Sequence, residues 1–571
     1  MVSISLLLAV LIGVAALLSH GQGGSSHGGS AATRRPNIVM IIDDDQTAEQ
    51  QRFLAKTNSA IGGHGVTFNN SFVNFSLCCP SRSTLMTGQY AHNHRVLGDE
   101  PPAGGYEKLA PTLGNTLPVW LQRAGYHTGL FGKFLNHYGR VSPTAVPPGW
   151  NEWYGEVDNH RVGGNYSVYG YTLNENGRLV HYGSRPSVVD PPVFSTDVLS
   201  RLAAGFIRRR ARSDQPFFLY IAPRDPHLEP IACRCPFDNP RAAPRHEGTL
   251  AGLTAPRTAN FNEADVSDKP PAVRNLPLLP PTEIKRIDAR YRAEAESLLG
   301  VDDLVENVVR TLKQQGDLGN SVILFTSDNG FFHGEHRINR GKVLPYEPSI
   351  RVPLLIRAPG LPQGVHRRQP VGNVDLAPTI LDFARARPGR VQDGQSLIPI
   401  MRDPRYWPGR GLDLEAYRKP VNAKQGSSPP VIFQGVRTDR YMYARYRSGA
   451  QELYDLRNDP LELQNAASDP AYAGARTALQ RLLGQLVNCV GRACRGKPAL
   501  SLQVHGCSTA AVSGTGVPQA ATFYLAGRWL GRDDTPPIRI GLPPGSRGKN
   551  LQAVATSLDG RIVSMEQRLR C

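Results

Sequence analysis

The chain has 571 residues, of which 40% are apolar and 20% charged, a composition typical of globular proteins. This excludes a wholly disordered chain, a coiled coil and a protein with many membrane spans. By length, three or four domains would fit, and so would one large α/β domain with an appendage. The 57 Gly and 47 Pro indicate a loop-rich enzyme rather than a helical bundle.

The formal net charge is +17, which favours anionic partners such as nucleic acid, an anionic glycan or a membrane surface. Only 11 of the 65 cationic residues are Lys, however, and Arg, Ala, Gly and Pro share G/C-rich codons. The sequence therefore leaves two interpretations open. The charge is either a surface for polyanions or the codon bias of a G+C-rich bacterial genome.

Residues 4–18 form an apolar run without charge, and a Gly/Ser-rich stretch follows up to residue 32. The run is shorter than the ~20 residues of a membrane span and suits the apolar part of a secretory signal. We expect residues 1–32 to be a signal peptide with a linker, and the protein to be secreted or associated with the cell envelope. An uncleaved anchor, which would hold the protein at a membrane, stays open.

Eight cysteines are consistent with export, and their spacing matches no zinc finger. Cys78 and Cys79 are adjacent and poorly placed to bridge each other. For the other six we expect disulfides Cys489–Cys494 and Cys507–Cys571, with a tight third pair, Cys233–Cys235, left open.

Several short apolar runs end abruptly in polar residues, as strands buried on both faces do. Helical patterns lie between the runs, the clearest over residues 298–312. This alternation predicts an α/β fold with a mostly parallel sheet flanked by helices, whose ligand sites gather at the carboxyl ends of the strands. The polar residues that follow the runs should therefore share one site. The runs are residues 38–42, 126–131, 217–221 and 322–325.

The pattern changes twice towards the C-terminus. Residues 386–497 show a mixed α+β pattern that ends in an amphipathic helix around residues 479–486. From residue 500, alternating runs separated by Gly/Pro turns predict a small, Ig-like β-sandwich over residues 500–571. We expect the main catalytic domain to span residues 33–385.

The most informative stretch is residues 78–88, C-C-P-S-R-S-T-L-M-T-G. Pro80 suits the first turn of a helix, which would place Cys78 just ahead of a helix N-terminus that favours an anion. Arg82 adds a planar, charged fork. Locally, a nucleophilic thiolate and an ordinary buried cysteine would each explain Cys78.

This stretch resembles the signature of the type I, formylglycine-dependent sulfatases, C-x-P-S-R-x-x-L-x-T-G, at every fixed position. The resemblance covers about residues 35–490 and implies the alkaline-phosphatase-like sulfatase fold. It implies that a formylglycine-generating enzyme oxidises Cys78 to formylglycine, whose hydrated aldehyde attacks sulfur and expels the alcohol. Cys79 falls at a variable position.

Two further stretches resemble the metal-binding turns of this family: the acids that follow residues 38–42, and T-S-D-N-G at residues 326–330. Asp43 falls where the family varies and is left out. Oxygen ligands suit Ca²⁺ or Mg²⁺ better than zinc or copper, and the resemblance favours Ca²⁺. The metal ligands that it implies are Asp44, Asp45, Cys78, Asp328 and Asn329.

Residues 132–136, G-K-F-L-N, resemble the G-K motif of the family, which gives Lys133 the role of a sulfate-contacting lysine. Many arylsulfatases carry His two residues after this lysine, where this chain has Leu135. The Leu-Asn variant is the one that glucosamine-6-sulfatases and heparan endosulfatases show.

Two more residues take their roles from the resemblance. His227 aligns with the substrate-binding histidine, although Arg224-Asp225 before it departs from the commoner A-P-H-x-P. Lys342, in R-G-K, matches the second sulfate-binding lysine. His333 and His336 in the loop before Lys342 are interpreted as supporting or surface residues.

These residues fit one reaction. Breaking the S–O bond of a sulfate monoester spreads negative charge, which a divalent ion with Arg82, Lys133 and Lys342 would stabilise. His227 would assist proton transfer at the leaving group. We expect hydrolysis of a small sulfate ester or sulfated glycan, first of all N-acetylglucosamine 6-sulfate, and no nucleic-acid partner. The alternatives are a phosphomonoester or phosphonate hydrolase of the same superfamily, and a non-catalytic anionic-glycan binder.

Overall fold

A computed structural model describes residues 34–570 except 165, 230–238, 404–409, 419–429, 496–499, 515–517, 536 and 558–561. The expected signal segment and the Cys233–Cys235 pair lie outside these described residues. Within them, none of the helices combines the length and apolar character needed to span a membrane.

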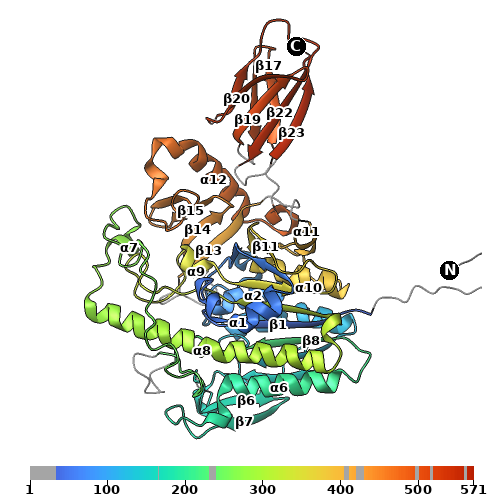
Figure 1. Cartoon of the computed structure of the whole chain (residues 1–571), viewed down its shortest axis with the longest axis vertical. Coiled ribbons are helices and arrows are strands. Elements are labelled where there is room, and N and C mark those ends of the chain that lie inside the picture. The colour runs from blue at the N-terminus through green and yellow to red at the C-terminus, as the bar shows by residue number, and fades with distance from the viewer. Residues whose placement is uncertain are drawn as a thin grey trace, which may run out of the picture. The chain divides into compact units, whose positions relative to one another are not determined.

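A mixed sheet of ten strands forms the centre of the fold (Figure 1). In chain order its strands are β1 (Asn37–Asp43), β2 (Val66–Phe68), β4 (His127–Gly132), β5 (Glu152–Glu156), β6 (Tyr171–Glu175), β7 (Arg178–Tyr182), β8 (Phe217–Ala222), β9 (Ser321–Ser327), β10 (Leu354–Arg357) and β11 (Val365–Arg367). Their order in the sheet is β11-β2-β10-β9-β1-β8-β4-β5-β6-β7. The four predicted apolar runs became β1, β4, β8 and β9.

The middle of the sheet is parallel, as predicted: β9, β1, β8, β4 and β5 all pair in parallel. Antiparallel pairs occur towards both edges, between β10 and its two neighbours and along β5, β6 and β7. The parallel core brings the carboxyl ends of four neighbouring strands to one edge.

Helices cover both faces of this sheet, because alternate residues of its central strands are apolar on either side. On one face Met40 packs with residues of α2 (Cys78–Thr87), α5 (Leu117–Arg123) and α10 (Leu376–Ala384). On the other, Ile41 packs with α6 (Ser195–Arg210) and α8 (Pro281–Gln314), which run side by side (Figure 1). Shorter elements complete this region: α1 (Ala55–Thr57), α3 (Ala91–His94), α4 (Tyr106–Leu109), α7 (Pro271–Arg274), α9 (Glu347–Ile350), α11 (Ile398–Arg402), and the paired strands β3 (Ser71–Phe72) and β12 (Val371–Gly372).

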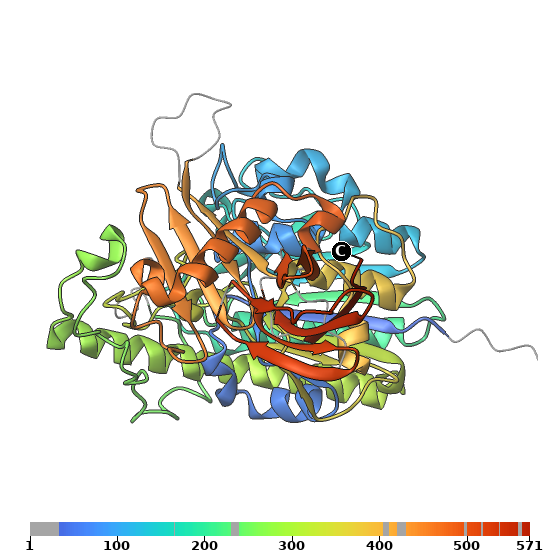
Figure 2. The same ribbon diagram turned by 90° about the horizontal axis from the view of Figure 1, so that it is seen from above.

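A second, antiparallel sheet follows, of β13 (Leu412–Tyr417), β14 (Val431–Arg437), β15 (Tyr441–Tyr446) and β16 (Gln451–Asp455). Helix α12 (Ala473–Leu486) packs on this sheet through Leu479 and Leu482. The helix and the sheet are orange in Figure 2. The predicted Cys489–Cys494 disulfide is present. This is the smaller α+β part expected from the sequence.

The last segment is all β, as predicted. One sheet contains β17 (Leu500–His505), β18 (Thr509–Gly514) and β21 (Arg539–Gly541), and the other β19 (Pro518–Leu525), β20 (Arg528–Asp533), β22 (Asn550–Ser557) and β23 (Ile562–Arg568). Val512 of one sheet and Phe523 of the other share a small core, which makes the segment a β-sandwich. Cys507 is disulfide-bonded, and its expected partner Cys571 lies outside the described residues.

Candidate active site

The residues predicted for the site meet at the carboxyl edge of the parallel core. Asp44 and Asp45 follow β1, and Asp328 follows its neighbour β9. His227 follows β8 and Lys133 follows β4, the next two strands across the sheet. Asn329 and Lys342 come from the chain after β9. Adjacency of these strands brings together residues up to about 300 positions apart, as the sequence predicted.

Cys78 enters this edge from α2. It is the first residue of that helix rather than the residue before it, so the predicted helix begins one position earlier. Pro80 lies in the first turn, as predicted, where its missing N–H costs no hydrogen bond. Gly88 ends the helix at φ 66°, a left-handed conformation that favours glycine. Every residue of α2 is buried, so the position of Cys78 is fixed by packing.

Two lysines and an aspartate surround the Cys78 sulfur. Lys342 Nζ donates to Sγ at 3.1 Å, and Sγ lies 3.4 Å from Asp44 Oδ1. Lys133 Nζ donates to the other oxygen of Asp44 at 2.5 Å. Cys78 and Lys133 are almost fully buried, whereas the side chain of Lys342 keeps 12% of its surface exposed. The sulfur therefore lies inside a buried cluster of cationic and anionic groups.

The remaining acids are paired with cations or amides in the same cluster. Arg82 Nε donates to Asp328 Oδ2 at 2.7 Å, with both side chains fully buried. Asn329 Nδ2 donates to Asp45 Oδ1 at 2.6 Å, and Lys342 also pairs with that carboxylate. Asp45 itself has φ 77°, a left-handed conformation that is uncommon for an aspartate and concentrates at functional sites.

The donor set of this cluster fits a divalent cation. Ligand atoms of Asp44, Asp45, Cys78 and His227 all lie within 4.8 Å of one another. Oδ1 of Asn329 is buried without a hydrogen-bond partner, which a cation would supply. The three carboxylates balance the charges of Arg82, Lys133 and Lys342, so a bound divalent ion would leave the site with its own positive charge for an anionic substrate.

The pKa values follow from burial and these pairs. Burial and Asp44 raise the pKa of the Cys78 thiol well above its usual value, so the encoded thiol stays protonated. Burial would also raise the pKa of Asp44, but Lys133 and other cations hold it well below its usual range. Burial and the neighbouring Asp44 raise the pKa of Asp328 to about 6. Asp44 is therefore more firmly ionised than Asp328.

His227 lies at the mouth of the cluster, with 23% of its side chain exposed. Its Nδ1 lies 2.6 Å from the backbone oxygen of Leu228, which only accepts, so Nδ1 carries a hydrogen. Nε2 lies 3.9 Å from Asp45 Oδ2. Burial, helped by Lys133 and Lys342, lowers the pKa of His227 although Asp44 and Asp45 oppose this. Neutral His227 thus presents an acceptor nitrogen to the site.

A cleft of about 410 Å³ opens beside His227. Most of its lining is polar or charged, and several of these groups are held by the protein itself: Asp158 by Arg140, and Glu229 by Arg241. Tyr166 is one of the lining residues, and Lys133 Nζ lies 5.4 Å from its ring centre. The lining residues are Asp99, Glu100, Asn136, His137, Arg140, Asp158, His160, Tyr166, His227, Leu228 and Glu229.

Sequence reasoning missed most of this lining. Tyr166 and Asp99 stand in loops, match no motif and follow no strand, so no signal marked them. Asp99 accepts a hydrogen bond from the backbone N–H of Cys79 at 2.9 Å, which ties the cleft wall to the start of α2. Only the three-dimensional structure brings these loops to the site.

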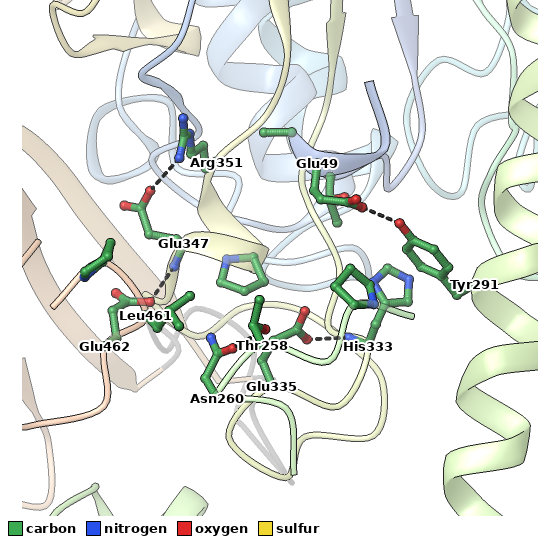
Figure 3. Close-up of a pocket in the computed structure, with 15 residues that line it drawn as sticks. Glu49, Thr258, Asn260, Tyr291, His333, Glu335, Glu347, Arg351, Leu461 and Glu462 are labelled. Carbon is green, nitrogen blue, oxygen red and sulfur yellow. Dashed lines mark hydrogen bonds and ion pairs between the residues drawn. The ribbon is translucent and has the colours of Figure 1, made fainter. Parts of the chain in front are cut away.

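A second cavity, of about 210 Å³, contains none of the predicted site residues (Figure 3). Figure 3 shows His333, Glu335 and Tyr291 on one part of its wall and Glu347 with Arg351 on another. His333 is buried and pairs with Glu294, and His336 is buried and pairs with Glu263. Both histidines are therefore supporting residues, and the surface alternative is wrong.

Comparisons with known proteins agree with the fold. A family model described as Sulfatase matches residues 36–386, and one described as N-sulphoglucosamine sulphohydrolase, C-terminal, matches residues 334–488. An arylsulfatase of Volvox carteri is 33% identical over 489 residues, 78% of this chain and 72% of the relative. The N-acetylglucosamine-6-sulfatase of Capra hircus is 33% identical over 482 residues, 77% and 81% of the two chains.

Among solved structures, one protein in complex with its substrate D-glucosamine-2-N,6-O-disulfate has a TM-score of 0.63 and 23% identity. The aligned region covers 79% of this chain and 97% of that protein's chain. The fold and the cationic cluster suit a hydrolase of anionic esters. The chain belongs to the sulfatase family and is a sulfuric ester hydrolase. The prediction of an enzyme is therefore confirmed, and the alternative of a non-catalytic glycan binder is wrong.

Proposed function

We propose that the protein hydrolyses sulfate monoesters of sugars by a formylglycine nucleophile at position 78, with 6-sulfated N-acetylglucosamine as the first substrate to test. The observation that carries the proposal is the convergence of Cys78, Lys133 and Lys342 on one buried cluster. The cleft that Tyr166 and His227 line lies next to it. A phosphomonoester or phosphonate hydrolase would need the same cationic cluster, so the experiment below includes both ester types.

In this proposal Asp44, Asp45, Asp328, Asn329 and residue 78 hold one divalent ion. Their oxygens suit Ca²⁺ or Mg²⁺ rather than zinc or copper, and the resemblance to the family favours Ca²⁺. When bound, the ion supplies positive charge next to the sulfate oxygens, and formylglycine supplies the nucleophile. Lys133 and Lys342 orient the sulfate from the two sides of residue 78. Arg82 holds Asp328 in place from behind.

Proton transfer is assigned to His227. Its acceptor Nε2 faces the cluster, while Nδ1 is fixed by the carbonyl of Leu228. To act as an acid at the leaving alcohol, His227 must first take up a proton, and Asp44 and Asp45 favour its charged form. The position of Nε2, 3.9 Å from Asp45 Oδ2, supports the role.

A sugar substrate is supported by the character of the cleft. Apart from Leu228 and the Tyr166 ring, the residues that line it carry carboxylate, amide, imidazole and guanidinium groups, which can hydrogen-bond to the hydroxyls of a sugar. The two residues of the Leu-Asn variant have different surroundings. Leu135 is buried in the apolar core, while Asn136 lines the cleft, with a buried Oδ1 that lacks a hydrogen-bond partner.

The organisation of the chain is part of the proposal. We assign residues 33–385 to the catalytic domain, 386–497 to its C-terminal subdomain and 500–571 to the β-rich module, in line with the separate sheets. Secretion or attachment to the cell envelope is supported by the Cys489–Cys494 disulfide, because disulfides persist in oxidising compartments. A formylglycine-generating enzyme would act on the chain before Cys78 is buried.

The test combines product and modification. Active protein is digested and the peptide containing residue 78 is weighed by mass spectrometry, while release of sulfate or phosphate is measured from matched sugar esters, 4-nitrophenyl esters and a phosphonate monoester. We expect an aldehyde at residue 78 and the fastest turnover on 6-sulfated N-acetylglucosamine. Full activity with an unmodified thiol would refute the mechanism. Faster phosphate or phosphonate hydrolysis would refute the substrate class.

A further inference from the structure

A second buried group of charged side chains lies where α3 meets the C-terminal sheet. His92 on α3 faces Asp413 and Glu415 of β13, which are two residues apart and so point to the same side of the strand. All three residues are at least 93% buried, and their ligand atoms lie within 4.8 Å of one another. None of them belongs to the active-site cluster.

The hydrogen bonds fix which nitrogen of His92 faces the acids. Nε2 lies 3.1 Å from the backbone oxygen of Cys489, which only accepts, so Nε2 carries a hydrogen. Nδ1 lies 3.2 Å from each oxygen of Glu415 and 3.6 Å from Asp413 Oδ2. A bare lone pair on Nδ1 would be repelled by these oxygens, so a proton or a metal cation must lie between them.

A proton meets this requirement only in part. One N–H can bond well to Glu415, and Asp413 Oδ2 is then left buried without a hydrogen-bond partner, as the structure has it. Two carboxylates with one imidazolium also keep a net negative charge in the interior. Burial and the nearby Glu415 raise the pKa of Asp413 to about 6. Burial lowers the pKa of His92, but the two acids beside its Nδ1 raise it to about 11, so a metal must displace a firmly held proton.

We propose that His92, Asp413 and Glu415 bind a divalent transition metal, with Zn²⁺ the best match. The separations of 3.2 and 3.6 Å agree with the roughly 3.3–3.6 Å between two ligands of a tetrahedral ion at bond lengths of about 2.0–2.2 Å. A divalent ion in place of the Nδ1 proton would make the group neutral. Imidazole with carboxylates suits zinc better than Ca²⁺ or Mg²⁺, which take oxygen ligands.

The surroundings of the group already resemble the outer contacts of a metal site. The Nε2 hydrogen bond to a backbone carbonyl is one that metal-bound histidines usually make. Tyr417 donates to Glu415 Oε2 at 2.8 Å, and the ring of Tyr90 stacks on His92 at 5.7 Å. The nearby Cys489 sulfur is tied up in its disulfide and is not available as a ligand. The metal would join α3, next to the signature helix α2, to the C-terminal sheet.

Zinc content of the full-length protein tests the proposal. Because the group is buried, the protein is produced with added zinc, dialysed with excess Ca²⁺ and analysed by inductively coupled plasma mass spectrometry. We expect about one zinc per wild-type chain and at least a fivefold loss in Asp413→Asn. The exposed-histidine control His366→Gln and the active-site variant Asp328→Asn should keep the zinc, which separates this site from surface binding and from the catalytic metal.

Two results would overturn the proposal. One is wild-type protein with less than about a tenth of a zinc per chain, which would show that a proton alone joins His92 to the acids. The other is unchanged zinc in Asp413→Asn. If that variant does not fold, X-ray absorption of zinc in the wild-type protein decides: one imidazole with oxygen ligands supports the site, while sulfur or several imidazoles refute it.

Discussion

The cluster of charged residues at the strand ends and the cleft beside it are built in different ways. The cluster comes from the ends of adjacent strands and from α2, and its charges are buried and paired, as Arg82 is with Asp328. The cleft is lined by loops, and its charged groups range from half-exposed, as Arg140 is, to buried, as Glu229 is. Rigid elements therefore position the reacting groups, while loops decide what binds next to them.

If the cluster holds the chemistry, removing its central residue should have the largest effect. We expect Cys78→Ala to lower kcat on a sulfated sugar at least about 10⁴-fold, because the nucleophile is lost and the remaining charges only bind the ester. Near-ultraviolet circular dichroism should stay unchanged, since alanine fits the space left by the sulfur. A variant that kept a tenth of the activity would place the chemistry elsewhere.

The second prediction concerns the charge balance within the cluster. Asp328→Asn keeps the size of the side chain but removes a carboxylate from the proposed metal site and from Arg82. We expect kcat/KM to fall on the order of 10³-fold, and chelation of divalent metal from the wild-type protein to do the same. Calcium added back should restore the wild-type enzyme and not the variant. Full turnover by thoroughly metal-stripped protein would contradict the assignment of the acids.

His227 lies at the boundary between the cluster and the cleft. The effect of replacing it on kcat should depend on the leaving group of the substrate. We expect His227→Gln to lower kcat about 10²-fold on a sugar sulfate, whose alkoxide needs a proton. A 4-nitrophenyl sulfate has a good leaving group, so its kcat should fall only a few-fold. Equal losses on both substrates, or a change confined to KM, would show that His227 binds substrate rather than transferring a proton.

The same contrast explains what the sequence could predict. Asp44, Asp45, Asp328 and Lys133 follow uninterrupted apolar strands, and parallel strands bring their ends together, so their convergence was predictable. Cys78 carried a motif with many fixed positions. The predicted helix start differed from the observed one by one residue, because the cysteine itself already joins the first turn.

The rest depends on contacts between distant loops. Tyr166 reaches Lys133, and Asp99 reaches Cys79, through loops whose paths no local pattern encodes. The antiparallel hairpin of β6 and β7, which extends the parallel core at one edge, also escaped prediction. His92 and Glu415 are 323 positions apart, and only the packing of the C-terminal sheet brings them together.

A fourth prediction concerns the pH dependence of stability that the buried Asp225 causes. Burial raises the pKa of Asp225 to about 7, although Thr196 donates to it, so the folded protein favours the neutral acid. The stability that the neutral Asp225 contributes is complete below about pH 4, near the pKa of an unfolded aspartate. It is lost as the pH rises to about 7, the pKa in the folded protein. Asp225→Asn should therefore stabilise the protein at pH 8, by a few kcal/mol at most, and leave pH 4 almost unchanged. Melting temperatures at both pH values check this, and an equal shift at both would contradict it.

The smallest effect should come from the net positive charge of the protein. A formal charge of +17 attracts a polyanion over the ~8 Å screening length of physiological salt, whereas a small ester gains little from it. Between about 50 and 300 mM salt we expect kcat/KM on a heparan-type oligosaccharide to fall several-fold, and on N-acetylglucosamine 6-sulfate less than twofold. Initial rates at low substrate concentration measure both, with kcat followed separately to show that salt leaves the buried cluster intact. Equal salt dependence of the two substrates would mean that the basic residues reflect codon bias and that the cleft alone selects the substrate.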